Sequence, residues 1–383
     1  MMAACHGAQS GESDTTGAST DATTSRPSDA ESSDVATGST EVGPAIVEGE
    51  CETVVEDLVV SYAFWDALEL APGAPIPAER LAEVERLSLH TKSVASLAGL
   101  ECAGGLLTLS LQSDGTGGNS PHTVTDLSPL LGLPRLQRLE LRYGAFGDIT
   151  LLPGIPTLNH LDLRSSMVSD LSVLSSLPVL QTLIISDTPV SDLAPVAGCT
   201  SLANLYARGT PIVDVAVLAG SDSLRHVEID DTAVTEVAAL AGMPGLLGLD
   251  VSRTAVANLS AFSESGLSQL FASETQIGAI PESLPITNGR FAGNGIVDIS
   301  PLLTWEGPAS VDLSDNAIED VSPLLSLPWD FGNGACLHIR LQGNPLSHPD
   351  TANVIQQACA AYSVVIEAEN GLGCMHQQCI TSD

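Results

Sequence analysis

The sequence predicts an α/β solenoid, a horseshoe of stacked repeats with about twelve parallel strands on its concave face. The pattern L-x-x-L-x-L recurs along the chain, and its last apolar residue returns in five consecutive steps of 22 residues from Leu141 to Val251. Five residues after that position most repeats have Val, Ile or Phe, and seven residues after it most have an acid. Hydrophobic residues make up 44% of the chain but aromatic residues only 3%. The core must therefore consist of small aliphatic layers, as in proteins that reuse one apolar side chain per repeat position.

The predicted repeats occupy residues 84–346, and each supplies one short strand and one turn-rich convex segment. The last apolar residue of each strand falls at Leu89, Leu111, Leu141, Leu163, Ile185, Ala207, Ile229, Val251, Ala272, Phe291, Leu313 and Leu341. The acid that follows in most repeats precedes an apolar segment, where Asp caps helical turns by accepting backbone N–H bonds. We therefore interpret the acids as structural and expect neither a metal site nor a cofactor.

Two segments show the full convex pattern: 168–178 reads VSDLSVLSSLP and 318–328 reads IEDVSPLLSLP. With the 22-residue period, they resemble the leucine-rich-repeat family, specifically the internalin-like class of bacterial surface proteins. The resemblance covers residues 52–367 and implies protein–protein interaction or adhesion rather than catalysis. One departure is that the family's usual Asn after the strand persists only in the last repeats, as at Asn316, whereas earlier repeats have a hydroxyl residue such as Thr188. A hydroxyl can also bond the turn backbone, so the fold is still expected.

Both ends of the array need caps, because each repeat buries its apolar face only against its neighbours. A helical N-terminal cap is predicted over 48–83, where residues 62–70 have helical apolar spacing. A C-terminal cap and Cys-containing tail are predicted over 347–383, with a helix at 349–362 and a closing strand at 363–367.

Residues 1–47 are rich in Ser, Thr, Gly and Asp, and such a segment cannot bury enough surface to offset its chain entropy. We interpret them as a disordered acidic linker. The residues Ala3, Ala4 and Cys5 resemble the end of a bacterial lipoprotein signal, although no charged start or apolar segment precedes them. Lipidation of Cys5 and an exported, lipid-anchored location at the cell envelope or cell surface are therefore expected. The alternative is an ordinary polar N-terminus.

The charge excludes several classes of partner and reaction. With 47 acids against 13 Lys and Arg residues, the net charge is −34, which repels nucleic acid and anionic lipid surfaces. No apolar stretch reaches the length of a membrane-spanning helix, so any membrane contact is expected through Cys5 alone. Lys92 is the only lysine, and no phosphate-binding Gly-Lys-Ser/Thr loop or hydrolase motif occurs. The chain is therefore predicted not to be an enzyme.

The eight cysteines gather near the ends of the array, which favours export and disulfide stapling over zinc binding. A bond between Cys51 and Cys102 would staple the N-terminal cap. The four that could form two bonds at the other end, with a connectivity that cannot be deduced, are Cys336, Cys359, Cys374 and Cys379. Cys199 occupies an apolar convex position and is expected to be a buried free thiol.

Basic residues concentrate at the outward-facing strand positions of the concave side. Of the 11 Lys and Arg residues in 84–346, seven fall there, together with six acids, so this face is about neutral on a strongly acidic chain. The candidate ligand-binding residues are Arg138, Arg142, Tyr143, His160, Arg164, Tyr206, Arg208, His226, Phe271 and Arg290. Arg and Tyr are frequent in binding hot spots. The alternative is that these bases pair with acids on neighbouring strands and only neutralise the sheet.

The predicted function is that of a non-enzymatic module that binds an unidentified protein through its concave sheet. Two alternatives stay open: binding of a carbohydrate or peptidoglycan fragment, and a purely structural role in the envelope. The fold alone does not choose among them.

Overall fold

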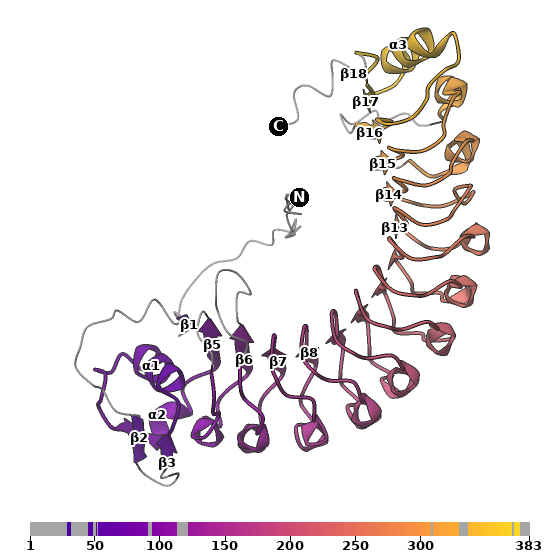
Figure 1. Cartoon of the computed structure of the whole chain (residues 1–383). Coiled ribbons are helices and arrows are strands. Elements are labelled where there is room, and N and C mark those ends of the chain that lie inside the picture. The colour runs from indigo at the N-terminus through magenta and orange to yellow at the C-terminus, as the bar shows by residue number, and fades with distance from the viewer. Residues whose placement is uncertain are drawn as a thin grey trace, which may run out of the picture.

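The computed structural model is a curved solenoid whose strands line the concave side and whose short helices form the convex side (Figure 1). It describes residues 29–31, 45–48, 51, 53–90, 94–112, 122–307, 309–328, 336–369 and 371–375. None of the helices in these ranges is long and apolar enough to cross a membrane.

Each repeat contributes one strand and, in most cases, one short 3₁₀ helix. The repeat strands are β5 (Arg86–His90), β6 (Thr108–Gln112), β7 (Arg138–Leu141), β8 (His160–Asp162), β9 (Thr182–Ile184), β10 (Asn204–Tyr206), β11 (His226–Glu228), β12 (Gly248–Asp250), β13 (Gln269–Phe271), β14 (Asn288–Arg290), β15 (Ser310–Asp312) and β16 (Leu337–Arg340). The convex helices are η1 (Leu100–Cys102), η2 (Ser128–Gly132), η3 (Leu152–Gly154), η4 (Ser172–Ser176), η5 (Ala194–Gly198), η6 (Ala216–Leu218), η7 (Ala238–Gly242), η8 (Ser260–Phe262), η9 (Ser300–Thr304) and η10 (Ser322–Ser326).

The repeat strands pair in parallel and in sequence order, within a sheet that also includes β1 (Asp29–Glu31), β17 (Val364–Glu367) and β18 (Cys374–Met375). The predicted horseshoe with about twelve parallel strands is therefore confirmed. Because successive strand residues face opposite sides, the leucines of neighbouring repeats stack into one buried column, as at Leu161, Leu183 and Leu205. Each repeat thus adds one layer to a continuous aliphatic core.

The turn after each strand is stabilised in two ways. In earlier repeats a threonine hydroxyl donates to a carbonyl of its own repeat, as Thr232 does to Ile229 O at 2.6 Å. In the last repeats Asn316 does more: its Nδ2 donates to Leu313 O at 3.0 Å and to Phe291 O at 2.8 Å in the preceding repeat. The hydroxyl therefore preserves the turn, as expected, but Asn also joins adjacent repeats.

The N-terminal cap consists of α1 (Leu58–Ala67), α2 (Ala78–Leu81) and a small sheet of β2 (Ala45–Glu48), β3 (Thr53–Val55) and β4 (Ile76–Pro77). The helix α1 begins earlier than predicted, because Asp57 caps it by accepting from Val59 N at 2.8 Å. Asp57 also accepts from Ala95 N at 2.7 Å and so joins the cap to the first repeat. Val47 is fully buried, so the cap begins at Ala45, within the range assigned to the linker.

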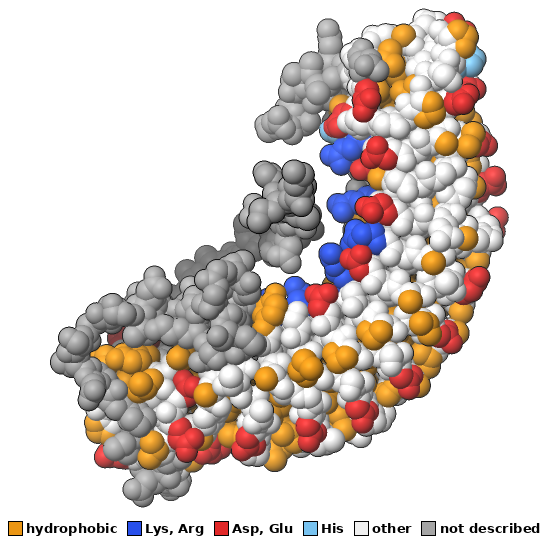
Figure 2. All heavy atoms as spheres, viewed as in Figure 1, with side chains coloured by type: hydrophobic (Ala, Val, Ile, Leu, Met, Phe, Trp, Pro, Cys, Tyr) orange, Lys and Arg blue, Asp and Glu red, His pale blue; other side chains and the backbone are white. Residues whose placement is uncertain are grey.

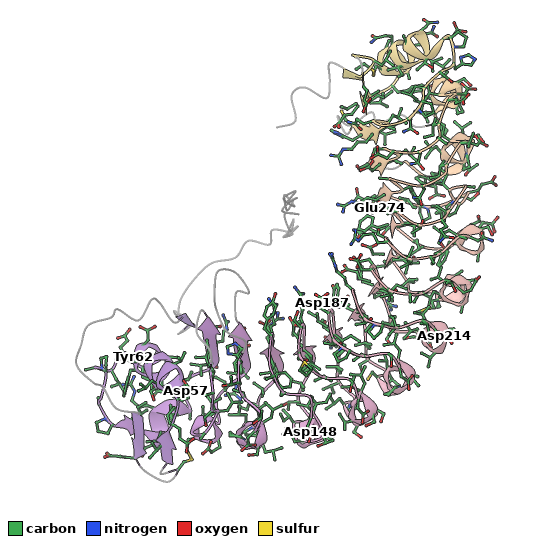
Figure 3. The ribbon with its side chains drawn as sticks, in the orientation of Figure 1. Asp57, Tyr62, Asp148, Asp187, Asp214 and Glu274 are labelled. Atoms are coloured by element: carbon green, nitrogen blue, oxygen red, sulfur yellow. A yellow bond between two sulfur atoms is a disulfide. The ribbon has the colours of Figure 1, made fainter. Side chains whose placement is uncertain are left out.

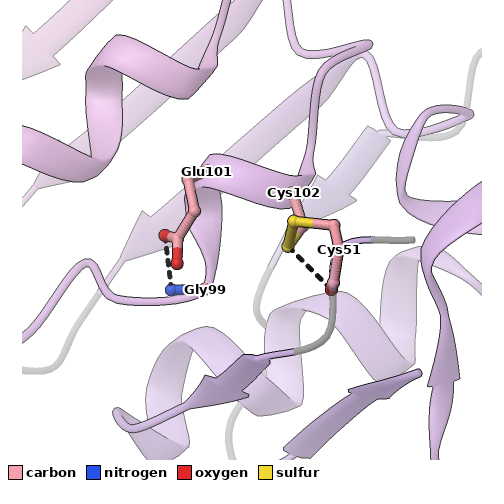
Figure 4. Close-up of a disulfide and its surroundings, with 4 residues drawn as sticks. All are labelled: Cys51, Gly99, Glu101 and Cys102. Carbon is pink, nitrogen blue, oxygen red and sulfur yellow. Dashed lines mark hydrogen bonds between the residues drawn. A yellow bond between two sulfur atoms is a disulfide. The ribbon is translucent and has the colours of Figure 1, made fainter. Parts of the chain in front are cut away.

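A disulfide bond between Cys51 and Cys102 connects this cap to η1, where Glu101 accepts from Gly99 N at 2.7 Å (Figure 4). At the other end, Cys359 of α3 (Thr351–Ala361) is bonded to Cys374 of β18, and Cys336 is also disulfide-bonded. The predictions of disulfide bonds and of a helix–strand C-terminal cap are therefore confirmed. Residues Cys5 and Cys379 lie outside the described ranges.

Candidate binding surface on the concave face

Outward-facing side chains of the concave sheet form columns, because the parallel register pairs equivalent residues of successive repeats. The column that we name the central column consists of Glu140, Asp162, Ile184, Tyr206, Glu228, Asp250, Phe271, Arg290, Asp312 and Arg340. Neighbouring members are one strand spacing apart, about 4.8 Å. Basic and acidic side chains therefore lie side by side along the inner surface (Figure 2).

The first group of charges, which we name the paired cluster, consists of Arg138, Glu140, Arg142 and Asp162. Glu140 and Asp162 are buried although they belong to the concave sheet. Arg138 pairs with Glu140, and its Nε donates to Oε1 at 2.7 Å. Arg142 Nε donates to Asp162 Oδ2 at 2.6 Å across the strand boundary. Each buried carboxylate of this cluster therefore has its own arginine.

The imidazole of His160 lies beside the paired cluster. Its Nδ1 is 3.2 Å from Arg138 Nη1, and its Nε2 is 3.9 Å from Glu140 Oε1. Burial, followed by the charge of Arg138, lowers the pKa of His160 to about 4. The ring is therefore neutral near pH 7, and Nδ1 can accept from the Arg138 guanidinium.

A second group of charges, the arginine–aspartate network, lies at the turns after β10, β11 and β12. Arg253 Nη2 is 2.8 Å from Asp230 Oδ2, and Arg253 Nε is 2.5 Å from Asp231 Oδ1. Arg208 Nη2 is 3.0 Å from Asp231 Oδ2, and its Nε is 3.5 Å from Asp230 Oδ2. The hydrogen bond from Arg253 holds the pKa of Asp231 below its ordinary value. Arg208 and Arg253 thus each form ion pairs with both Asp230 and Asp231.

Glu228 and Asp250 differ from the other acids of the central column. They are register partners on β11 and β12, and neither forms an ion pair with any residue that the structure describes. Burial and the neighbouring Asp250 raise the pKa of Glu228 to about 7. Burial also raises the pKa of Asp250, whose Oδ1 accepts from Ser252 N at 2.8 Å.

Aromatic side chains flank these two carboxylates within the central column. Tyr206 precedes Glu228, and Phe271 follows Asp250. The guanidinium of Arg290 lies over the Phe271 ring, 4.6 Å from its centroid, in a cation–π contact. Beside them, the missing side chain of Gly248 leaves a hollow of about 20 Å³, which is room for about one water molecule.

The structure brings the predicted binding residues into two neighbourhoods on one face. Those near β7 and β8 are Arg138, Arg142, Tyr143, His160 and Arg164. Those near β10 to β14 are Tyr206, Arg208, His226, Phe271 and Arg290. Their proximity does not test whether they contact a ligand, and that assignment stays a prediction.

One residue per repeat, two or three positions after the strand ends, adopts a left-handed backbone conformation over ten repeats. These residues are Tyr143, Ser165, Asp187, Gly209, Asp231, Arg253, Glu274, Gly293, Asp315 and Gly343. Asp187 and Glu274 of this series project from the inner edge (Figure 3). Arg253 is not among the predicted binding residues, although Tyr143, at the equivalent position of an earlier repeat, is. A signal for it exists in the sequence, since Arg253 lies one 22-residue step beyond Asp231.

The acids of the convex side form local turns. Asp148 Oδ1 accepts from Thr150 N at 2.8 Å, and Asp214 Oδ1 accepts from Ala216 N at 2.7 Å. Both lie on the outer side, away from the concave sheet (Figure 3). They form Asx turns immediately before the 3₁₀ helix rather than capping it as its N-cap residue. Their role is structural.

The thiol of Cys199 lies at a hollow of about 250 Å³ between η5 and η6. Burial raises its pKa to about 11, so the sulfur is protonated near pH 7. Because the thiolate is the form that attacks electrophiles and binds metals, Cys199 is a poor nucleophile.

No protein-family model and no curated protein sequence matches the chain. Solved structures do match. An internalin (InlF) from Listeria monocytogenes is 25% identical with a TM-score of 0.60, over 75% of this chain and 89% of that one. Internalin C2 from the same species is 22% identical with a TM-score of 0.52, over 57% and 93%. A leucine-rich-repeat protein from Leptospira interrogans is 13% identical with a TM-score of 0.57, over 79% of each chain.

The chain is an internalin-like leucine-rich-repeat protein. The likenesses to internalin C2 and to the Leptospira protein concern the fold alone. In this internalin-like solenoid, the convex acids form local turns of the fold. The concave charges and aromatic rings lie on the strands, whose inward-facing apolar residues contribute to the core. The concave face is therefore the candidate binding surface.

Proposed function

We propose that this internalin-like protein is a non-enzymatic module that binds a protein partner through its concave sheet. The observation that carries the proposal is the arginine and aromatic content of that face. Arg208 and Arg340 each expose 52% of their side chains, and Arg290 is exposed above the Phe271 ring. Arginine and aromatic residues are enriched at the centres of protein interfaces.

The proposal includes display at the cell envelope. Lipidation of Cys5 followed by the acidic linker would hold the solenoid away from a membrane that its net charge of −34 repels. Disulfide bonds at both ends of the array favour an oxidising compartment. The intact mass of the protein isolated from membranes tests this part, because a lipid on the Cys5 sulfur adds a defined mass. An unmodified Cys5 would contradict it.

The test of binding uses the full chain as bait for an envelope extract of the source organism, with captured proteins identified by mass spectrometry. The concave variant is Phe271→Ala with Arg290→Glu, which changes the cation–π pair without touching a buried ion pair. The matched control is Val213→Gln, because Val213 is 61% exposed and lies outside the strands. We expect a purified partner to lose affinity about tenfold or more for the concave variant only.

Equal retention by both variants would contradict binding through the concave sheet. Capture of envelope glycan instead of protein would favour the carbohydrate alternative. A chain that retains neither would favour the structural role.

A further inference from the structure

Three of the five acids of the central column form ion pairs with arginines, and the two at its centre form none with a described residue. Glu140 and Asp162 have arginine partners near one end, and Asp312 is 3.7 Å from Arg340 at the other. Glu228 and Asp250, between these ends, have no ion pair with a described residue. The sheet therefore leaves two adjacent carboxyl groups without an ion-pair partner among the described residues.

A positive charge is left over on the same face. Arg164 follows β8 and forms no ion pair among the residues described, although its neighbour Arg142 does. Its Nε is buried and has no hydrogen-bond partner. Because this atom is closed to solvent, a partner's acidic group would meet the guanidinium from the partly exposed side of the residue.

The unpaired charges do not neutralise each other across the sheet. The charge of Arg164 acts on Glu228, but the two side chains form no ion pair. Arg164 follows β8, and Glu228 lies on β11. These strands are three strand spacings apart, which is about 14 Å between backbones. Arg208 and Arg253 lie nearer to the acids but are already bound to Asp230 and Asp231.

The central column between and beside the unpaired charges is partly apolar and aromatic. Ile184 and Tyr206 lie between Arg164 and Glu228, and Phe271 lies beyond Asp250. The ring of Phe271 already accepts one guanidinium, that of Arg290. A lysine or arginine side chain from a partner could therefore lay its apolar stem on a ring and its charge against the two carboxylates.

We propose that the region from Arg164 to Asp250 recognises an extended protein segment that carries both an acidic and a basic side chain. The acidic group meets Arg164, and the basic group meets Glu228 and Asp250. In an extended chain, about 3.3 Å per residue places two such groups about four positions apart, where both side chains face the same side. This inference rests on the proposed function, since it specifies the partner of the same face. The net charge of −34 further favours partners with a basic surface.

The probe is a library of random dodecapeptides displayed on phage and selected on the immobilised full chain. We expect enriched peptides to pair a Lys or Arg with an Asp or Glu about four positions away. The variant Arg164→Gln, Glu228→Gln, Asp250→Asn removes the three charges, with side-chain size kept at the two acids and reduced at Arg164. It should lose this preference, with affinity for the best peptide reduced about tenfold. Asp312→Asn is the matched control, because it changes a paired acid of the same column.

Charge reversal makes the test independent of folding. A variant with Arg164→Glu and Glu228→Arg should prefer a peptide whose acidic and basic positions are exchanged, and thermal melting confirms that each variant is folded. Enrichment without a charge pair, an unchanged preference in the variants, or no enrichment at all overturns the inference.

The two proposals fail in different ways. Peptides that depend on Phe271 and Arg290 but not on Arg164, Glu228 and Asp250 leave concave binding intact and reject the charge-pair inference. Binding that is indifferent to both sets of substitutions rejects both.

Discussion

The paired cluster and the centre of the concave face have the same residue types but opposite arrangements of charge. In the paired cluster, Asp162 is fully buried and bound to Arg142. At the centre, Glu228 and Asp250 lie one strand apart, and neither forms an ion pair with a described arginine. The residue composition of a strand therefore does not reveal whether one of its charged side chains stabilises the fold. The ion-pair partners decide it, and they come from neighbouring repeats.

The concave arginines are accordingly of two kinds. Arg142, with 25% of its side chain exposed, neutralises buried carboxylates and so supports the fold. Arg164 forms no ion pair with a described carboxylate. Self-pairing, one of the two alternatives from the sequence, therefore holds for one part of the face, and ligand contact stays a proposal for the other.

The largest expected effect is the loss of the buried acid in the paired cluster. Asp162→Ala removes the acceptor of both Arg142 Nε and Arg164 N. We expect the free energy of unfolding to fall by about 3 kcal/mol, because breaking a buried pair leaves an uncompensated charge. Urea denaturation measures it. The control Asp312→Ala should cost less than about 1 kcal/mol, since its partner Arg340 is half exposed. Equal losses would show that the paired cluster is not special.

Most of the fold could be predicted from the sequence, because the repeat period directly records the layer spacing of a solenoid. The twelve strands and the C-terminal helix followed by a strand are examples. The small sheet of β2, β3 and β4 was not predicted, because its strands are two to four residues long and pair across the helix α1. Strands that short have no detectable alternation of polar and apolar residues.

For the candidate site, the sequence predicts which face of the sheet carries it but not how the side chains of that face pair. The alternation of strand residues identifies which side chains point outward, but ion pairs depend on side-chain direction across strands. Arg142 is 2.6 Å from Asp162 in the next repeat but 3.9 Å from Glu140 in its own repeat. Arg253 lies at a turn position outside the strands. The left-handed conformation at that position is occupied by Arg, Glu, Asp, Ser and Tyr as well as Gly, so glycine content does not reveal it.

A smaller effect of opposite sign is expected at the centre of the face. Glu228 has a pKa raised from 4.5 to about 7, so the folded protein retains a proton that the unfolded chain releases. The contribution of the Glu228 carboxyl to the free energy of unfolding is therefore fully present below about pH 4.5 and is lost as the pH rises through about 7. Glu228→Gln should stabilise the protein by about 1–2 kcal/mol near pH 8 and have little effect near pH 4.

Thermal melting of this variant at both pH values measures the difference. Glu274→Gln is the control, because Glu274 is an exposed carboxylate on the same side. A variant that is less stable than the unaltered protein near pH 8 would show that Glu228 has a stabilising partner, and the centre would then resemble the paired cluster.

The smallest effect is expected where ion pairs are most exposed. This prediction tests whether burial or ion pairing causes the difference in stability contribution between the paired cluster and the centre. Arg340 is 3.7 Å from Asp312 and 3.4 Å from Glu367, yet 52% of its side chain is exposed. Water and salt screen such pairs, so Arg340→Gln should change the free energy of unfolding by no more than about 0.5 kcal/mol. Urea denaturation at low and high salt measures it, and high salt should leave no difference. A loss as large as that of Asp162→Ala would mean that pairing alone stabilises the concave sheet, and that the unpaired charges at its centre are correspondingly costly.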